Sequence, residues 1–358
     1  MESWIRSAGW LVCMAVAPWS AVSADGERPA PVVAIKPDRI ILLDIDKSGE
    51  RLVAVGERGF VLYSDDDGKT WTARPTPVTR TLTGVAFKDP QTGVAVGHGG
   101  SVVRTEDAGA TWSQVQVEEA GTDSLLDVQH LGGDHFIAYG AFGLYLDSPD
   151  AGRSWTRRTI LGSTSTDDAG NEAGEPPADE EEAEYLDEGF DRHISRVIQV
   201  DSTLLLVAES GTLARSSDGG ANWTRLESPY EGSWFNALAV DDGSVLVFGM
   251  RGNVFRTADL GATWEKIPLG TTASLMGGAQ LADGRILLVG NTGLLALSSD
   301  RARTLELHWS PASKGFAQVV EADGRLLAVG EGGVSVIDPA WLGAEGDSLP
   351  AGTVPRGD

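Results

Sequence analysis

The segment SDDDGKTW at residues 64–71 decides the fold, because the chain repeats it. Copies with the same spacing of Ser or Thr, Asp, Gly and Trp begin at residues 105, 148, 216 and 257. A sixth copy begins at Ser298, but it has Ala302 in place of the glycine, and its tryptophan is displaced to Trp309. A segment repeated with fixed spacing predicts a modular fold in which each copy closes the same local turn.

Each copy follows two apolar segments joined by a glycine-bearing turn, as in VGERGFV at residues 55–61. The first glycine of this turn is Gly56 in one unit and Gly97 in the next, 41 residues apart. Corresponding turns give seven units, with glycines at Gly140, Gly211, Gly249, Gly290 and Gly330. A period near forty residues, rich in β-branched residues and Gly or Asp turns, predicts an all-β, seven-bladed β-propeller over residues 31–341.

The expected strands follow from the repeat. In the second unit they are expected at Leu82–Phe87, Val94–Gly97, Val102–Thr105 and Thr111–Val117. The last unit supplies only three, at Phe316–Glu321, Leu326–Val329 and Val334–Ile337. We expect Pro31–Ile35 to supply the missing outer strand of the last blade, so that the ring closes without an unpaired edge.

The repeated segment resembles the Asp-box, or BNR, repeat. Its carboxylate can accept backbone N–H bonds of its own turn, its glycine can take a positive φ, and its tryptophan can bury a large apolar face. Calcium takes about 6–8 oxygen ligands, whereas each box supplies one key carboxylate, so we interpret the boxes as structural. The structural residues are Asp66, Asp107, Asp150, Asp218, Asp259, Trp71, Trp112, Trp155, Trp223 and Trp264.

Asp boxes also occur in sialidases and glucan-active hydrolases, so a glycoside hydrolase is the alternative function. A sialidase carries a Phe/Tyr-Arg-Ile-Pro motif before the first box, where this chain has IKPDRI at residues 35–40. Tyr63, Tyr139 and Tyr145 fall at equivalent positions of the repeat and are interpreted as packing residues. The five histidines have no metal-ligand spacing, and there is no phosphate loop, serine elbow or CxxC, so no catalytic, metal or cofactor-binding residue is predicted.

Residues 1–24 have the pattern of a secretory signal peptide, with Arg6, an apolar run from Trp10 to Pro18 and small residues before a cut after Ala24. This predicts export across the inner membrane to the periplasm, or to the lumen in a photosynthetic host. The chain has 28 Lys and Arg against 52 Asp and Glu, a net charge of -24 that argues against a nucleic-acid partner. The mature chain has no apolar run near the ~20 residues of a membrane-spanning helix, so direct membrane insertion is not expected.

Two features indicate a binding face. The turns between the second and third strand of each blade share one face of a propeller, and their side chains vary among the units. The candidate partner-binding residues in these turns are Arg58, His98, Phe142, Met250 and Arg251. Phe142 and Met250 are apolar residues at expected turn tips and suit an adaptable apolar contact.

An acidic insertion at residues 163–192 emerges on the same face, between the third and fourth units. It holds twelve acidic residues and one arginine, which predicts a flexible, solvated segment. Its residues 180–190 would order as a short helix against a partner, or the whole insertion would serve only to increase solubility. Residues 343–358 are expected to form a disordered tail.

The signal peptide, the single seven-unit ring, the VGxxGxV turns and the Asp boxes together resemble the photosystem II stability/assembly factor family, from Val32 to Trp341. This resemblance implies an exported, non-enzymatic scaffold or assembly factor that binds a membrane protein or complex. It also implies an arginine-rich binding face, for which Arg58, Arg80 and Arg251 are the counterparts here. In non-photosynthetic bacteria the resemblance implies a periplasmic accessory of an RND/MMPL-type exporter.

Overall fold

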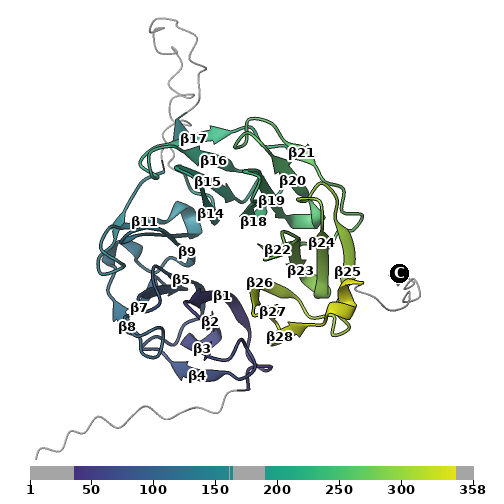
Figure 1. Ribbon diagram of the computed structural model, residues 1–358. Coiled ribbons are helices and arrows are strands. Elements are labelled where there is room, and N and C mark those ends of the chain that lie inside the picture. Colours follow the sequence, from purple (N-terminus) through teal and green to yellow (C-terminus); the bar gives the residue numbers. More distant parts are fainter. Residues whose placement is uncertain (1–35, 161, 164–189, 344–358) are drawn as a thin grey trace, which may run out of the picture. The chain divides into compact units, whose positions relative to one another are not determined.

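The structure is a computed structural model that describes residues 36–160, 162–163 and 190–343. Seven sheets, which we number as blades 1 to 7 in chain order, are arranged in a ring, and their strands are antiparallel except for one short strand in blade 4 (Figure 1). The prediction of an all-β, seven-bladed β-propeller is therefore confirmed.

The first three blades have four strands each. Blade 1 contains β1 (Leu42–Ser48), β2 (Arg51–Gly56), β3 (Phe60–Ser64) and β4 (Thr72–Pro75). Blade 2 contains β5 (Leu82–Phe87), β6 (Gly93–Gly97), β7 (Ser101–Thr105) and β8 (Ser113–Val115). Blade 3 contains β9 (Leu125–Gly132), β10 (His135–Gly140), β11 (Tyr145–Ser148) and β12 (Thr156–Arg157).

The other blades repeat this pattern. Blade 4 contains β14 (Ile194–Val200), β15 (Thr203–Ala208), β16 (Leu213–Ser216), β17 (Trp223–Leu226) and, parallel to β17, the short β13 (Gly162–Ser163). Blade 5 contains β18 (Trp234–Ala239), β19 (Val245–Gly249), β20 (Val254–Thr257) and β21 (Glu265–Lys266). Blade 6 contains β22 (Leu275–Gln280), β23 (Ile286–Gly290), β24 (Leu294–Ser298) and β25 (Glu306–Trp309). Blade 7 contains β26 (Phe316–Ala322), β27 (Arg325–Gly330) and β28 (Gly333–Ile337).

Among the residues that the structure describes, the helical segments are six single 3-10 turns. Four of them connect the second and third strands of their blades: η1 (Glu57–Gly59), η3 (Ala141–Gly143), η4 (Met250–Gly252) and η5 (Asn291–Gly293). The other two are η2 (Glu118–Ala120), between blades 2 and 3, and η6 (Pro339–Leu342), after β28. Within the described ranges, no helix is long and apolar enough to cross a membrane.

Apolar clusters between neighbouring blades hold the ring together. Val94 and Val96 of blade 2, for example, pack with Phe136 and Trp155 of blade 3, and all four side chains are buried. Close packing of such faces provides most of the stabilisation of stacked sheets. The polar side chains in the inner strands are therefore exceptions to be explained.

The Asp boxes are closed hydrogen-bonded turns. In the first box the Ser64 hydroxyl donates to Asp66 Oδ1 at 2.7 Å, and the Thr70 N–H and hydroxyl donate to the two carboxylate oxygens at 2.8 and 2.6 Å. Gly68 has a φ of +75°, a conformation that suits glycine. The Trp71 Nε1–H donates to the Gly68 carbonyl at 3.1 Å, so the ring covers its own turn. In the second box the Thr111 N–H and hydroxyl make the same bonds to Asp107, at 2.8 and 2.6 Å, so the outer strand of blade 2 begins after the box at Ser113 and not at the predicted Thr111.

The sixth box keeps this geometry without the glycine. The Thr304 N–H and hydroxyl donate to Asp300 at 2.9 and 2.7 Å, and Ala302 takes a φ of +56°. Leu305, which follows Thr304 as tryptophan does in the intact copies, packs against the core cluster of blades 5 and 6. Trp309 is 48% exposed, so the interpretation of Trp309 as the displaced box tryptophan is wrong.

Because of the Asp boxes, we expect the free energy of unfolding to fall in acid. Hydrogen bonds from the Thr70 hydroxyl to Asp66, and from the Thr263 hydroxyl to Asp259, lower the pKa of each carboxyl from 3.8 to about 2. Since these pKa values are lower in the folded state, the stabilisation is complete above pH 3.8 and is lost as the pH falls towards 2. Urea unfolding at several pH values should show this decline. The double variant Asp66→Asn/Asp259→Asn should show a shallower one, and equal slopes for the two proteins would contradict the assignment.

Blades 1 and 7 meet through apolar packing and backbone contacts. Leu42 and Leu52 pack with Leu327 and Val329, and the Val334 N–H donates to the Pro37 carbonyl at 3.0 Å. The predicted closing strand at residues 31–35 lies outside the described residues, so that closure stays a prediction. The predicted signal peptide, residues 164–189 of the acidic insertion and the tail from residue 344 also lie outside them.

Candidate functional site

The inner strand of every blade is interrupted by a β-bulge at the same place. In β1 the pairing with β2 shifts between Leu42 and Asp44. Equivalent shifts occur in β5, β9, β14, β18, β22 and β26. A bulge adds one residue to a strand and re-aims the neighbouring side chains. Seven bulges at one level therefore direct a set of side chains towards the axis of the ring.

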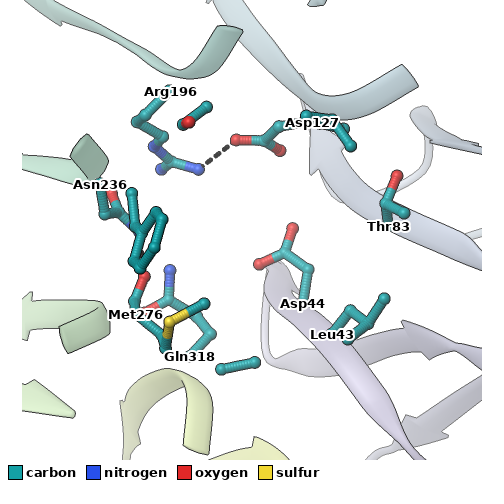
Figure 2. Close-up of a pocket in the computed structure, with 12 residues that line it drawn as sticks. Leu43, Asp44, Thr83, Asp127, Arg196, Asn236, Met276 and Gln318 are labelled. Carbon is teal, nitrogen blue, oxygen red and sulfur yellow. Dashed lines mark hydrogen bonds and ion pairs between the residues drawn. The ribbon is translucent and has the colours of Figure 1, made fainter. Parts of the chain in front are cut away.

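These side chains surround an axial cavity of about 190 Å³ (Figure 2). Leu43, Phe235 and Met276 form apolar parts of its wall. The polar lining residues are Asp44, Thr83, Asp127, Ser195, Arg196, Asn236 and Gln318. The lining comes from the inner strands of all seven blades, so only the closed ring assembles this site.

Asp127 and Arg196 form an ion pair across blades 3 and 4. Arg196 Nη1 donates to Asp127 Oδ2, the Tyr139 hydroxyl donates to the same oxygen at 2.9 Å, and the Val128 N–H donates to Oδ1 at 2.7 Å. Oriented with its oxygen towards the guanidinium, the Gln129 amide accepts from both terminal nitrogens of Arg196 at 3.2 Å. Both oxygens of Asp127 are thus occupied by protein donors.

The charges around this pair determine its protonation. Burial acts to lower the pKa of the Arg196 guanidinium, but the negative charge of Asp127, followed by that of Asp44, outweighs this effect and raises the pKa. Burial also raises the pKa of Tyr139 well above its usual value, and Asp127 adds to that rise. Arg196 is therefore charged and Tyr139 is a neutral donor at any physiological pH.

Asp44 is the second axial carboxylate and has a different environment. Its Oδ2 accepts the Val85 N–H of the next blade at 2.9 Å. Burial, followed by repulsion from Asp127, raises the pKa of Asp44 well above 3.8, and Arg196 offsets only part of the rise. Among the described residues, no lysine, arginine or histidine forms an ion pair with Asp44.

Two axial amides connect the blades on the other side of the cavity. Gln318 Oε1 accepts the Gly278 N–H of blade 6 at 3.0 Å and the Val319 N–H of its own strand at 2.9 Å. Asn236 Nδ2 of blade 5 donates to the Met276 carbonyl of blade 6 at 2.9 Å. The inner strands of different blades are thus linked by side chains, since each sheet ends at its inner strand.

The turns between second and third strands lie at the same end of the sheets as the starts of the inner strands. In blade 1, Gly56 at the end of β2 pairs with Leu42 at the start of β1, and the Glu57 N–H donates to the Ile41 carbonyl at 3.0 Å. The equivalent bond recurs in every blade, from His98, Ala141, Glu209, Met250, Asn291 and Glu331. We call the surface formed by these seven turns the turn face.

The predicted partner-binding residues lie on the turn face, but they do not form one cluster. Arg58, His98, Phe142 and Arg251 are exposed, and Met250 is half-buried. They come from blades 1, 2, 3 and 5, and only Met250 and Arg251 share a turn. Arg58, Phe142 and Arg251 have φ values of +61°, +52° and +57°, which is unusual for residues other than glycine.

Phe142 is the most exposed large apolar residue of the turn face, at 61%. Its ring makes an edge contact with the ring of His193, with 4.9 Å between the centroids. The Gly143 N–H donates to the Arg192 carbonyl at 2.9 Å, so the end of the acidic insertion lies directly beside this turn. An exposed aromatic ring fixed in this way can contact a partner with little loss of side-chain entropy.

The sequence patterns do not single out the axial residues. They predict Tyr139 as a packing residue, and its ring is buried, but its hydroxyl also donates to Asp127. The available signal was a polar residue near the start of an otherwise apolar inner segment, as at Asp44, Asp127, Arg196, Asn236 and Gln318. Within the described part of the chain, no group of three His, Cys, Asp or Glu side chains could hold a metal ion.

Comparison with known families identifies what the repeat resembles. Residues 70–164 match the family model of the photosynthesis system II assembly factor YCF48, and residues 62–73 match the BNR/Asp-box repeat. The resemblance to the photosystem II assembly factor family that the sequence predicts is thereby confirmed. No curated protein sequence matches the chain.

Solved structures share the fold at low sequence identity. A structure of YCF48 bound to D1 peptide has a TM-score of 0.65 and 17% identity, and the match covers 87% of this chain and 98% of that one. YCF48 from Cyanidioschyzon merolae has a TM-score of 0.64 and 16% identity, with 84% and 96% covered. The WD40 propeller domain of Doa1 has a TM-score of 0.59 and 10% identity, with 83% and 92% covered. At these identities the likeness shows the propeller fold.

Proposed function

We propose that this protein is a non-enzymatic assembly factor that binds a membrane protein, or a membrane protein complex, through its turn face. The observation that carries the proposal is the match of residues 70–164 to the YCF48 family model. The solved structure of YCF48 bound to D1 peptide supports it further, because that protein has the same fold and is bound to a peptide. The predicted signal peptide would bring the chain to its client on the far side of the inner membrane.

The axial residues give the glycoside hydrolase alternative no specific support. Most glycoside hydrolases use one carboxyl group as an acid and a second as a base or nucleophile, whereas sialidases use a tyrosine as the nucleophile. The Tyr139 ring is fully buried and its hydroxyl donates to Asp127. Asp127 accepts bonds from Arg196, Tyr139 and the Val128 N–H, so its lone pairs are directed at the protein. None of the comparisons supports an RND/MMPL exporter as the partner, which stays a prediction from the sequence.

The turn face itself suits a protein partner. Phe142 and Met250 provide apolar contact area, and Arg58 and Arg251 add positive charges that can pair with carboxylates of the client. Aromatic and arginine side chains are the residues that most often dominate the binding energy of an interface.

Changing Phe142, Met250 and Arg251 together to alanine should weaken retention of the membrane client by about a hundredfold or more, because each of the three contacts is worth about 1–2 kcal/mol. The measurement is a titration of the immobilised protein against detergent-solubilised membranes of the host, with bound membrane proteins identified and quantified by mass spectrometry.

The matched control is Arg153→Ala/Leu260→Ala, which removes a cation and an apolar side chain from Asp-box turns at the other end of the sheets. The control should retain the client as the unaltered protein does. Equal retention by the triple variant would show that the turn face is not the binding surface. Turnover of a glycoside by the purified protein, lost in Asp44→Asn, would instead support the hydrolase.

A further inference from the structure

The axial cavity lies just beneath the turn face. Asp44 is two residues beyond Leu42, which pairs with Gly56 immediately before the η1 turn. Two residues of a strand span about 7 Å, so the Asp44 carboxylate is within reach of a long side chain entering from the turns. A partner bound to the turn face can therefore place one side chain on the axis.

The charge of the cavity wall is unbalanced. Asp44 and Asp127 provide two carboxylates, whereas Arg196 is the single basic residue in the wall. Arg196 pairs with Asp127, whereas the one donor that binds Asp44 is a neutral backbone N–H, within the described residues. An ionised carboxylate in such a place is destabilised until a cation joins it.

The remaining wall specifies which cation fits. Leu43, Phe235 and Met276 offer apolar surface for a hydrocarbon stem, and about 190 Å³ is room for one side chain but not for a folded segment. A metal ion is disfavoured, because the lining contains only two carboxylates and both oxygens of Asp127 already accept protein donors. An anion is disfavoured as well, because the Asp44 carboxylate would repel it and Arg196 is already paired with Asp127.

We infer that the axial cavity binds a single alkylammonium group, and that in the assembly this group is a lysine side chain of the bound client. Lysine joins a flexible four-carbon stem to a compact charge, which matches an apolar wall that leads to one unpaired carboxylate. The assignment of the group to a client rests on the proposed function, but the preference of the cavity for an alkylammonium does not.

The test is calorimetric titration of the purified full-length protein with N-acetyl-lysine methylamide. N-acetyl-norleucine methylamide, which has the same stem without the charge, is the control ligand. The lysine compound should bind at least tenfold more tightly than the norleucine compound. Equal binding of the two, or binding of neither, would overturn the inference.

Two matched variants test whether the lysine compound binds at Asp44. Asp44→Asn should weaken binding of the lysine compound by about tenfold or more. Asp46→Asn removes the same charge from the same strand, but Asp46 is outside the cavity lining and binds the Phe87 N–H at 2.9 Å, so this variant should change affinity by less than about threefold. Unaltered binding by Asp44→Asn would place the ligand elsewhere.

Loss of folding does not explain the expected result for Asp44→Asn. Because burial raises the pKa of Asp44, its ionised form destabilises the fold above that pKa, so the asparagine variant should unfold at the same or a higher temperature. Binding to the unaltered protein should strengthen as the pH rises through the pKa of Asp44. The other groups that set this pKa are Asp46, Asp127 and Arg196.

The outcomes separate this inference from the proposed function. If the lysine compound binds and Asp44→Asn abolishes binding, the cavity is assigned whatever the membrane titration shows. If the membrane titration succeeds but the lysine compound does not bind, the turn face stands and the axial site fails.

Discussion

Replacing Arg196 by methionine should lower the free energy of unfolding by about 3 kcal/mol. The Asp127 side chain is only 9% exposed, and this variant leaves its charge without a cation. Only the Tyr139 hydroxyl and the Val128 N–H would then bind Asp127, and Asp44 would still repel it. The expected loss is at the low end of the ~3–5 kcal/mol found for broken buried pairs, because the Arg196 side chain is itself 21% exposed.

Urea unfolding of two further variants would show that the loss of stability comes from breaking the Arg196–Asp127 ion pair. The double variant Arg196→Met/Asp127→Asn should recover most of the lost stability, because no unpaired charge remains. Arg301→Met breaks an ion pair with Asp241 whose side chains are 53% and 46% exposed, and it should cost less than about 1 kcal/mol. If the double variant is as unstable as Arg196→Met, the loss of stability comes from the lost packing of the Arg196 side chain and not from the unpaired charge of Asp127.

Gly333→Ala should destabilise the ring by about 2–4 kcal/mol. Gly333 has a φ of +69°, and an added Cβ would overlap the Pro37 carbonyl oxygen, which belongs to the segment leading into blade 1. The clash is with backbone, so it cannot be relieved by turning a side chain. The variant should push the Pro37 segment away from blade 7 and so weaken the contact between the last and first blades.

Gly324→Ala is the matched control for that variant. Gly324 is in the same blade with a φ of +70°, and a Cβ there would meet nothing within 4 Å. It should therefore show only the cost of the left-handed backbone conformation, about 1 kcal/mol. The difference between the two variants in urea unfolding measures the contact between the blades. If Gly333→Ala and Gly324→Ala lose the same free energy of unfolding, the close contact between Gly333 and Pro37 contributes nothing to the closure of the ring.

The blades could be predicted because each is defined locally. The box at residues 64–71 contains the donors, the carboxylate and the glycine that close its own turn, so its sequence is sufficient to identify it. The sixth box shows the limit of this reasoning. Its bonds to Asp300 persist while Leu305 replaces tryptophan, so a search for tryptophan leads to the wrong residue, Trp309.

The axial site could not be predicted in the same way because it is not local. Arg196 and Asp127 are 69 residues apart and belong to different blades. Alternation along a strand predicts which side chains share a face, but a bulge between Leu42 and Asp44 shifts that alternation by one residue. The sequence contains no direct sign of this shift, and only ring closure brings the seven shifted positions together.

The seven bulges have a consequence for how this protein diverges. Five blades present a polar side chain at the bulge position, whereas blades 2 and 6 have Gly84 and Gly277 there. The backbone pairing around the bulge is the same whether the side chain is aspartate, arginine, asparagine or glutamine. A substitution there therefore leaves the ladder of its own sheet intact, but it alters both the chemistry of the centre and the bond to a neighbouring blade.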